Sequence, residues 1–231
     1  MDGILLIDKP TGLTSHKVIE IIRKKLNLKR VGHAGTLDPL ATGLLVIMIG
    51  KATKLSNLLI SQFKIYEVEI KLFLETDTGD ITGKIVKSEK ERIFEVKQVS
   101  EVINYFDNHT YWQKPPLYSA IKIRGRKLYE YARKGIKIDV PLRQVIIKKI
   151  ELVSYDKEKN LVSLKVECSK GTYIRSLVKD IAEKLETVAT VSKLRRISSG
   201  NFRIEQTIKL EEVEKEKIIP FKELVAKYKI I

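Results

Sequence analysis

The chain has 231 residues, with 44 Lys and Arg against 29 Asp and Glu, and therefore a net charge of +15. Hydrophobic residues make up 43%, which is enough for a folded core and excludes a disordered protein. No apolar run reaches the roughly 18–20 residues of a membrane span, the start lacks signal-peptide features, and Cys168 is the single cysteine. We therefore expect a soluble, cytoplasmic protein without disulfides or a structural zinc site.

The first 49 residues predict a strand, a helix and a second strand. Residues 3–7 are apolar and end at turn residues, which is typical of a short buried strand. Residues 15–27 have a helical apolar stripe, with Thr14 or Ser15 available as the N-cap. A glycine-rich stretch, residues 31–43, then leads into an apolar strand at 44–49.

The remainder predicts two half-buried strands and one long helix. Apolar and polar residues alternate over 66–74 and over 162–168, whereas residues 172–186 have a helical stripe. Because strands and helices mix without regular βαβ alternation, we predict an α+β fold with a mixed or largely antiparallel sheet. We expect one domain over residues 1–207 and a helical C-terminal tail over 208–231.

Positive charge concentrates in residues 114–149, which contain 11 basic and 2 acidic residues. Tyr118, Tyr129 and Tyr131 are interleaved with these cations. Clustered cations with aromatic rings are typical of a nucleic-acid surface, where charge releases counterions and rings stack on bases. The alternative is a solvated lysine-rich face, and the composition alone favours neither.

Asp38 is the first candidate for chemistry. Its loop, VGHAGTLDPLATG, has neither of the glycine spacings of nucleotide-binding loops. Pro39 biases Asp38 toward an extended backbone, so a stiff loop would present the carboxylate. The alternative is an ordinary Asp-Pro turn. The run Thr14-Ser15-His16 is interpreted as a helix cap rather than part of a catalytic triad.

Longer segments are more specific. GILLIDKPTGLTSHKV and VGHAGTLDPLATGLLVI, followed by TDTGDITG, PPLYSAIKIRGRKLYEYARKG, SKGTYIRSLVKDI and LRRISSGNF, resemble the TruB-type tRNA pseudouridine synthases. The resemblance covers about residues 1 to 220. It implies the pseudouridine synthase fold and an isomerase that needs no cofactor and no metal. Its substrate would be the T-loop uridine, position 55, of tRNA.

The resemblance also implies the catalytic residues. Asp38 would be the nucleophile, since an ionised carboxylate needs no activating base. Arg175 would pair with this carboxylate and keep it charged; the alternative is a solvent-facing arginine. Tyr66 would pack against the flipped uracil and take part in proton transfer, although its place on an apolar strand face equally suits a core tyrosine.

Further residues would bind the RNA. By resemblance, Lys9 braces the Asp38 loop, and His33 replaces the stacking that the flipped base leaves behind. Tyr173 and Leu194 would line the uracil pocket, although either could be an ordinary core residue. A thumb-like segment, residues 115–137, would close on the T-arm through its cations, which include Arg124, Arg126 and Lys127.

The sequence departs from the family in two places. The family's glycine-rich LGxGA is here Leu-Glu-Thr-Val-Ala at residues 185–189, which predicts a changed turn and a working site. The chain ends where the family continues into a C-terminal PUA domain, which we expect to be absent. The proposed enzyme would act as a monomer. Two alternatives are a tRNA-folding chaperone with incidental catalysis and a guide-RNA-dependent, dyskerin-like subunit.

Overall fold

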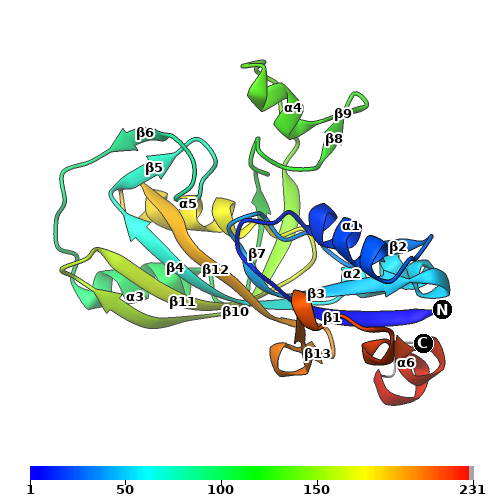
Figure 1. Cartoon of the computed structure of the whole chain (residues 1–231). Coiled ribbons are helices and arrows are strands. Elements are labelled where there is room, and N and C mark those ends of the chain that lie inside the picture. Colours follow the sequence, from blue (N-terminus) through cyan, green and yellow to red (C-terminus); the bar gives the residue numbers. More distant parts are fainter. Residues whose placement is uncertain (229–231) are drawn as a thin grey trace. The chain divides into compact units, whose positions relative to one another are not determined.

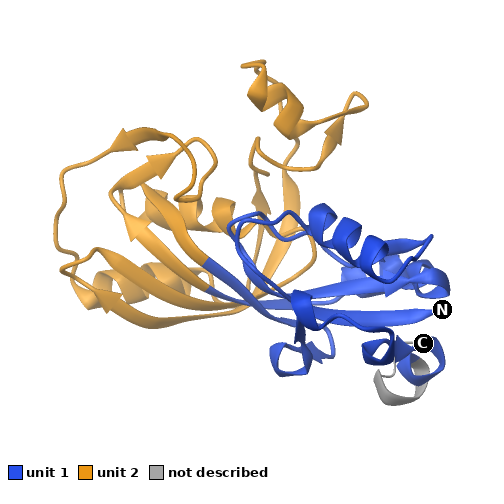
Figure 2. Ribbon diagram, viewed as in Figure 1, with its two compact units in different colours: residues 1–67, 194–231 blue, residues 68–193 orange. Residues whose placement is uncertain are grey.

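The computed structural model describes residues 1–228, with side chains through Leu224. The chain forms two compact units (Figure 2). Unit 1 comprises residues 1–67 and 194–231, and unit 2 comprises residues 68–193. The chain passes from one unit to the other within two strands, β4 (Lys64–Leu72) and β12 (Ala189–Ser199). Unit 1 is therefore built from the two ends of the chain.

The strands of unit 1 form a mixed sheet around β1 (Gly3–Lys9) and β3 (Thr42–Ile49), which are antiparallel. β3 also pairs with β2 (Val31–His33) in antiparallel and with the end of β12 in parallel orientation. Three two-residue strands complete the sheet: β13 (Phe202–Arg203) beside β12, and β14 (Ile208–Lys209) and β15 (Ile219–Pro220) beside β1. The predicted strands at 3–7 and 44–49 are confirmed.

The helices of unit 1 cover this sheet. α1 (Ser15–Lys25) lies along one side of β1 and β3, and α6 (Phe221–Tyr228) lies at the other (Figure 1). Consecutive residues of β1, such as Ile4 and Leu5, point to opposite faces of the sheet and are both fully buried, so both faces are covered. α2 (Ser56–Ser61) adds Leu59 to the core. Short 3-10 turns occupy Gly50–Leu55, Ile204–Gln206, Leu210–Glu212 and Lys215–Lys217.

Three strands of unit 2 pair with one another in antiparallel orientation. β10 (Arg143–Asp156) pairs with β11 (Leu161–Cys168) on one side and with β7 (His109–Gln113) on the other. α3 (Val96–Tyr105) contacts β10 and α5 (Ile174–Lys184). Two separate hairpins, β5 (Leu74–Thr76) with β6 (Ile85–Ser88) and β8 (Lys122–Ile123) with β9 (Arg126–Lys127), and the short α4 (Leu128–Arg133) complete the unit.

The α+β fold with a mixed sheet is confirmed, and three segments differ from the sequence-based expectation. The alternating stretch 66–74 is interrupted after Leu72, because Phe73 takes a left-handed φ of 64° and its amide donates to Val188 O at 2.7 Å. The glycine-rich stretch contains the strand β2, which its composition hides. No helix among the described residues is long and apolar enough to span a membrane.

The C-terminal segment 208–231, expected as a helical tail, is only partly helical within the described residues. Through residue 228 it contains β14, β15, two 3-10 turns and α6. Because β14 and β15 pair with β1, this segment belongs to unit 1. Residues 229–231 lie outside the described part.

Candidate active site

Asp38 lies on the loop between β2 and β3, and this loop is held at four consecutive carbonyl groups. The carbonyl oxygens of residues 37 to 40 each accept a hydrogen bond. The donors, in that order, are Ser15 Oγ at 3.1 Å, Ala41 N at 3.1 Å, Gly12 N at 2.8 Å and Thr11 Oγ1 at 3.1 Å. A change in any peptide plane of the loop would break one of these bonds, each of which contributes about 1 kcal/mol. The loop therefore presents the half-buried Asp38 in one backbone conformation.

Ser15 connects this loop to the start of α1. Thr14 is the N-cap of the helix, because its Oγ1 accepts from Lys17 N at 3.0 Å. The capping function leaves Ser15 available, and its buried hydroxyl both accepts from Leu37 N at 2.8 Å and donates to Leu37 O. Of the two N-cap candidates in the sequence, Thr14 is the N-cap. Ser15 instead holds Leu37, the residue before Asp38.

The buried ammonium group of Lys9 also holds this loop. The side chain is 0% exposed, and Nζ donates to Leu13 O at 2.7 Å, Pro10 O at 2.9 Å and Pro39 O at 3.4 Å. Burial lowers the pKa of Lys9 to about 8, while the negative charge of Asp38 opposes this shift. Lys9 thus remains mostly protonated at neutral pH and supplies a positive charge near Asp38. Its predicted contact with the loop is present, and its role toward substrate stays a prediction.

Two residues that sequence reasoning missed support the loop from β12 and β3. Arg196 is 1% exposed, and its guanidinium donates to Leu44 O at 2.7 Å and Gly35 O at 3.2 Å. Gly43 has a φ of 97°, and a Cβ there would lie 2.3 Å from Arg196 O. Only glycine therefore permits β3 and β12 to approach at this point. The sequence carried little signal, because an arginine in LRR reads as surface charge.

His33 is the last residue of β2 and pairs with Ile47. Its Nδ1 atom is buried and has no hydrogen-bond partner among the described residues. Burial lowers the pKa of His33, and the charge of Arg196 lowers it further. The imidazole is therefore neutral at pH 7. Stacking a neutral ring on a nucleic-acid base costs less desolvation free energy than stacking a charged ring. The proposed stacking on RNA remains a prediction.

Tyr66 and Leu194 are the other candidates of unit 1. Each side chain is 8% exposed, Tyr66 on the buried face of β4 and Leu194 on β12. A slightly exposed core residue and a pocket-lining residue have the same burial. The catalytic role of Tyr66 and the pocket role of Leu194 stay predictions.

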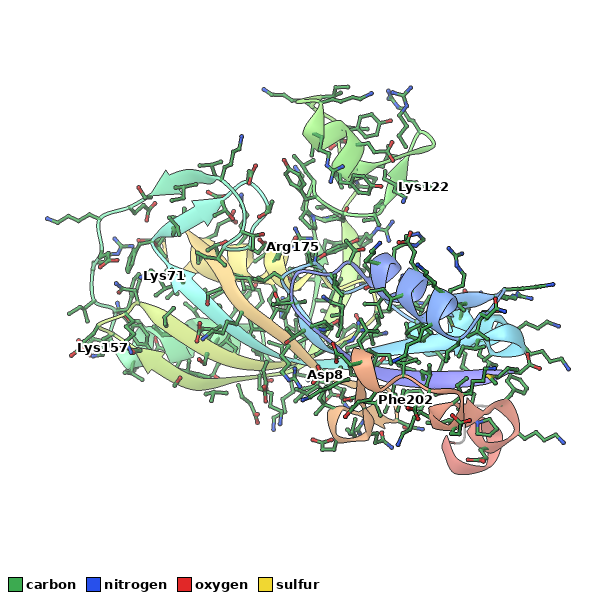
Figure 3. All side chains as sticks on the ribbon, viewed as in Figure 1. Asp8, Lys71, Lys122, Lys157, Arg175 and Phe202 are labelled. Carbon is green, nitrogen blue, oxygen red and sulfur yellow. The ribbon has the colours of Figure 1, made fainter. Side chains whose placement is uncertain are left out.

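In unit 2, Arg175 is the second residue of α5, as predicted, and its side chain is buried. The guanidinium donates to Thr78 O at 2.5 Å and to Tyr118 O at 2.9 Å. These carbonyls belong to the loop between β5 and β6 and to the start of the 115–137 segment. Arg175, labelled in Figure 3, is thus no solvent-facing arginine. Its contacts fix two loops of unit 2 at the start of α5.

A buried polar chain fixes Tyr173, the N-cap of α5. Tyr111 Oη donates to Asp180 Oδ2, Gln113 Nε2 donates to Tyr111 Oη, and Tyr173 N donates to Gln113 Oε1, each at 2.8 Å. Burial raises the pKa values of both Tyr111 and Asp180. Ser176 Oγ adds a bond to Lys114 O at 2.7 Å. The end of β7 therefore holds the helix start that carries both Tyr173 and Arg175.

The thumb, residues 115–137, projects from the rest of unit 2 (Figures 1 and 2). Its hairpin turns at Arg124 and Gly125, which both have positive φ, as a two-residue β-turn of type I′ requires. Arg124 and Arg126 are exposed, and Lys127 is partly exposed. The Tyr129 ring lies between cations, with Lys127 Nζ at 5.4 Å and Arg133 Cζ at 5.2 Å from its centroid. The Tyr129 ring thus makes cation–π contacts with two cations of the thumb, and its stacking on a base stays a prediction.

The candidate residues divide between the two units. Lys9, His33, Asp38, Tyr66 and Leu194 belong to unit 1, whereas Tyr173, Arg175 and the thumb cations belong to unit 2. The pairing of Asp38 with Arg175 stays a prediction. Within the described residues, no group of three or more His, Cys, Asp or Glu side chains could hold a metal ion.

Comparison with known families decides the classification. Residues 23–174 match the model for the N-terminal domain of TruB family pseudouridylate synthases, and residues 175–225 match that for the tRNA pseudouridylate synthase B C-terminal domain. The chain belongs to the TruB family. A tRNA pseudouridine synthase B of Mesoplasma florum is 46% identical over 99% of this chain and 80% of its own length. One of Caldicellulosiruptor saccharolyticus is also 46% identical, over 97% and 77%.

Solved structures agree with this membership. A chain of a Cbf5-Nop10-Gar1 complex matches with a TM-score of 0.73 and 30% identity, over 96% of this chain and 61% of that chain. A chain of an H/ACA RNP bound to a substrate RNA containing 2'-deoxyuridine matches with a TM-score of 0.69 and 27% identity, over 94% and 58%. The pseudouridine synthase fold predicted from the sequence is therefore confirmed.

Proposed function

We propose that this pseudouridine synthase acts on tRNA, converts the T-loop uridine at position 55 to pseudouridine, and uses Asp38 as its nucleophile. The observation that carries the proposal is the Asp38 loop, in which every carbonyl from residue 37 to residue 40 is hydrogen-bonded. A nucleophile held in one conformation lowers the entropic cost of attack. The names of the relatives that are 46% identical support tRNA as the substrate.

The reaction is an isomerisation, so it needs no oxidant, reductant or cofactor. The glycosidic C–N bond breaks, a C–C bond to the same base forms, and the proton lost from carbon is balanced by one gained on nitrogen. Asp38 would attack as a carboxylate, with Arg175 pairing with it and Tyr66 assisting proton transfer. The positive charge of Lys9 would attract the Asp38 carboxylate and hold it in the site.

RNA binding would use the remaining candidates. The exposed thumb cations, including Arg124 and Arg126, would contact phosphates of the T-arm. The neutral His33 would fill the stack that the flipped uridine leaves, while Tyr173 and Leu194 would line the base pocket. We propose that the enzyme performs this reaction as a monomer in the cytoplasm.

The guide-RNA-dependent alternative has weaker support. The relatives at 46% identity are named tRNA pseudouridine synthase B, whereas the matching chain of the Cbf5-Nop10-Gar1 complex is 30% identical. A chaperone role could coexist with catalysis, but it would require neither the braced Asp38 nor the buried Lys9 beneath it.

The decisive experiment is incubation of the protein with an unmodified tRNA transcript, without guide RNA, followed by site-resolved mapping of pseudouridine. We expect pseudouridine at position 55 only. A transcript in which that uridine is replaced by cytidine serves as the control and should remain unmodified. Absence of product, or product at another position, would contradict the proposal.

A further inference from the structure

A second basic surface lies on unit 1, outside the thumb. Residues 15–30 contain six basic side chains and one acidic side chain, Glu20. Figure 1 shows α1 on the outside of unit 1, and the turn Gly50–Leu55 contacts β2 beside it. We define the α1 surface by its exposed cations, Lys17, Arg23, Lys24, Lys29, Arg30, Lys51 and Lys54.

These cations have few acidic neighbours: Glu20, whose charge acts on Lys17 and Arg23, and Asp2, whose Oδ1 accepts from Lys51 N at 2.7 Å. Among the described residues, Lys17 is the one member of the α1 surface with an ion pair, to Glu20 at 3.2 Å. On the sheet of unit 2, in contrast, lysines alternate with glutamates and pair with them, as Lys148 does with Glu167 at 2.7 Å and Lys193 with Glu69 at 3.1 Å. Paired lysines make a solvated face; an unpaired cluster repels itself and favours an anionic partner.

The α1 surface begins beside the Asp38 loop. Ser15, the first residue of α1, holds Leu37, and the first cation follows at Lys17. The 11 residues of the helix extend about 16 Å away from that point, along a groove whose lining includes Lys17, Arg23 and Lys24 together with the acidic Glu20. Arg30 O accepts from Gly50 N at 2.9 Å, which joins the far end to the cations of the following turn. The charge therefore forms a track that starts at the candidate nucleophile.

The side chains of this track indicate which form of RNA it fits. Residues 15–30 and 50–55 contain no Phe, Tyr or Trp. Single-stranded nucleic acid is generally bound by aromatic stacking on its bases, whereas a duplex offers its phosphates and hides its bases. We infer that the α1 surface binds the phosphate backbone of the duplex stem next to the loop whose uridine reaches Asp38. This inference rests on the proposed function and adds a second binding surface to the thumb.

The test removes three cations of the α1 surface in the variant R23Q/K24Q/R30Q. The matched control, K157Q/K159Q/K165Q, removes the same number of charges from the hairpin of β10 and β11, where Lys157 and Lys159 have acidic partners. Binding of a T-arm stem-loop is measured against salt concentration. We expect the slope of log affinity against log salt to become shallower by roughly 2 to 3 in the α1 variant, because each lost phosphate contact contributes about 0.9. The control should retain the wild-type slope and activity.

A second RNA distinguishes duplex binding from attraction to any polyanion. It keeps the loop but has one stem strand replaced, so that the stem cannot form. The deficit of the α1 variant should be much smaller with this RNA. An equal deficit with both RNAs, or a slope no shallower than that of the control variant, would overturn the inference. Pseudouridine mapping on the wild-type protein reports separately on the proposed function, so either can fail without the other.

Discussion

The Asp38 loop and the thumb both carry residues assigned to the RNA, yet they are built in opposite ways. The Asp38 loop buries its supports, Ser15 and Lys9, and ties each carbonyl from residue 37 to residue 40. The thumb has two two-residue strands, a six-residue helix and mostly exposed cations. The contrast separates two tasks: a chemical group needs one fixed position, whereas a charged clamp needs reach and tolerates movement.

Asp38→Asn should have the largest effect. The swap is nearly isosteric and removes the nucleophilic charge, so turnover should fall by at least about 10⁴-fold, or more than about 5 kcal/mol of transition-state stabilisation. Folding, followed by thermal denaturation, and RNA binding should change little. Substantial turnover by a pure Asp38→Asn preparation would show that another group is the nucleophile.

Lys9→Met should reduce kcat by about 100-fold and remove a pH dependence. The Lys9 pKa is about 8, well below its unfolded value, so the ammonium loses its charge as the pH rises through 8. Wild-type kcat should therefore decline above pH 8, whereas the variant should be low and flat over pH 7 to 9. A wild-type profile that stays level to pH 9.5 would exclude this role.

The same shift affects stability. Between pH 8 and about 10.5, Lys9 binds fewer protons in the folded state than in the unfolded state. The contribution of Lys9 to the wild-type free energy of unfolding should therefore increase as the pH rises through this window. The Lys9→Met variant should lack that contribution. Urea unfolding of both proteins at pH 7.5 and 9.5 measures the difference.

R124Q/R126Q/K127Q should weaken RNA binding by about tenfold at moderate salt and flatten its salt dependence by roughly 2 to 3. Because the thumb supplies reach and no reacting group, the loss should appear in KM. K157Q/K159Q/K165Q is again the charge-matched control. A loss confined to kcat would mean that the thumb positions the reacting uridine as tightly as the Asp38 loop does.

Of the three changes at the Asp38 loop, Ser15→Ala should have the smallest effect. The change leaves the amide and carbonyl of Leu37 without their partner, which costs about 1–3 kcal/mol and loosens the residue beside Asp38. We expect kcat to fall about tenfold with KM little changed. Ser61→Ala is the control, because Ser61 Oγ donates to Leu58 O in an exposed position. Equal kinetics in both variants would show that the loop does not need its Ser15 brace.

Much of this arrangement could be predicted from the sequence. The rest could not, and the reason is physical. The stripe of α1, the position of Arg175 in the first turn of α5 and the stiffness of the Asp38-Pro39 loop all follow from local patterns. Apart from the local bond between Ala41 N and Asp38 O, the bonds that create the stiffness join residues 22 to 30 positions apart. Local spacing cannot report such contacts, although the resemblance to a known family pointed to Lys9.

Arg196 shows this limit most clearly. The two arginines of LRR are adjacent on β12 and point to opposite faces. Arg195 makes two hydrogen bonds with Asp8, at 3.0 and 2.7 Å, while Arg196 is buried against Leu44 O. Nothing in their spacing separates the partly exposed arginine from the buried one. Only the packing of β12 against β3 determines which of the two arginines is buried.

The discontinuity of unit 1 has a consequence for biosynthesis. During translation, β1 and β3 leave the ribosome early, but Arg196, which holds Gly35 and Leu44, follows Asp38 by 158 residues. At about 5–20 residues per second that delay is roughly 8 to 30 seconds. Unit 2 is contiguous and can fold during this delay, while the Asp38 loop still lacks its bond to Arg196. The segment that carries Asp38 is thus synthesised before unit 2 but receives the support of Arg196 only after unit 2 has been made.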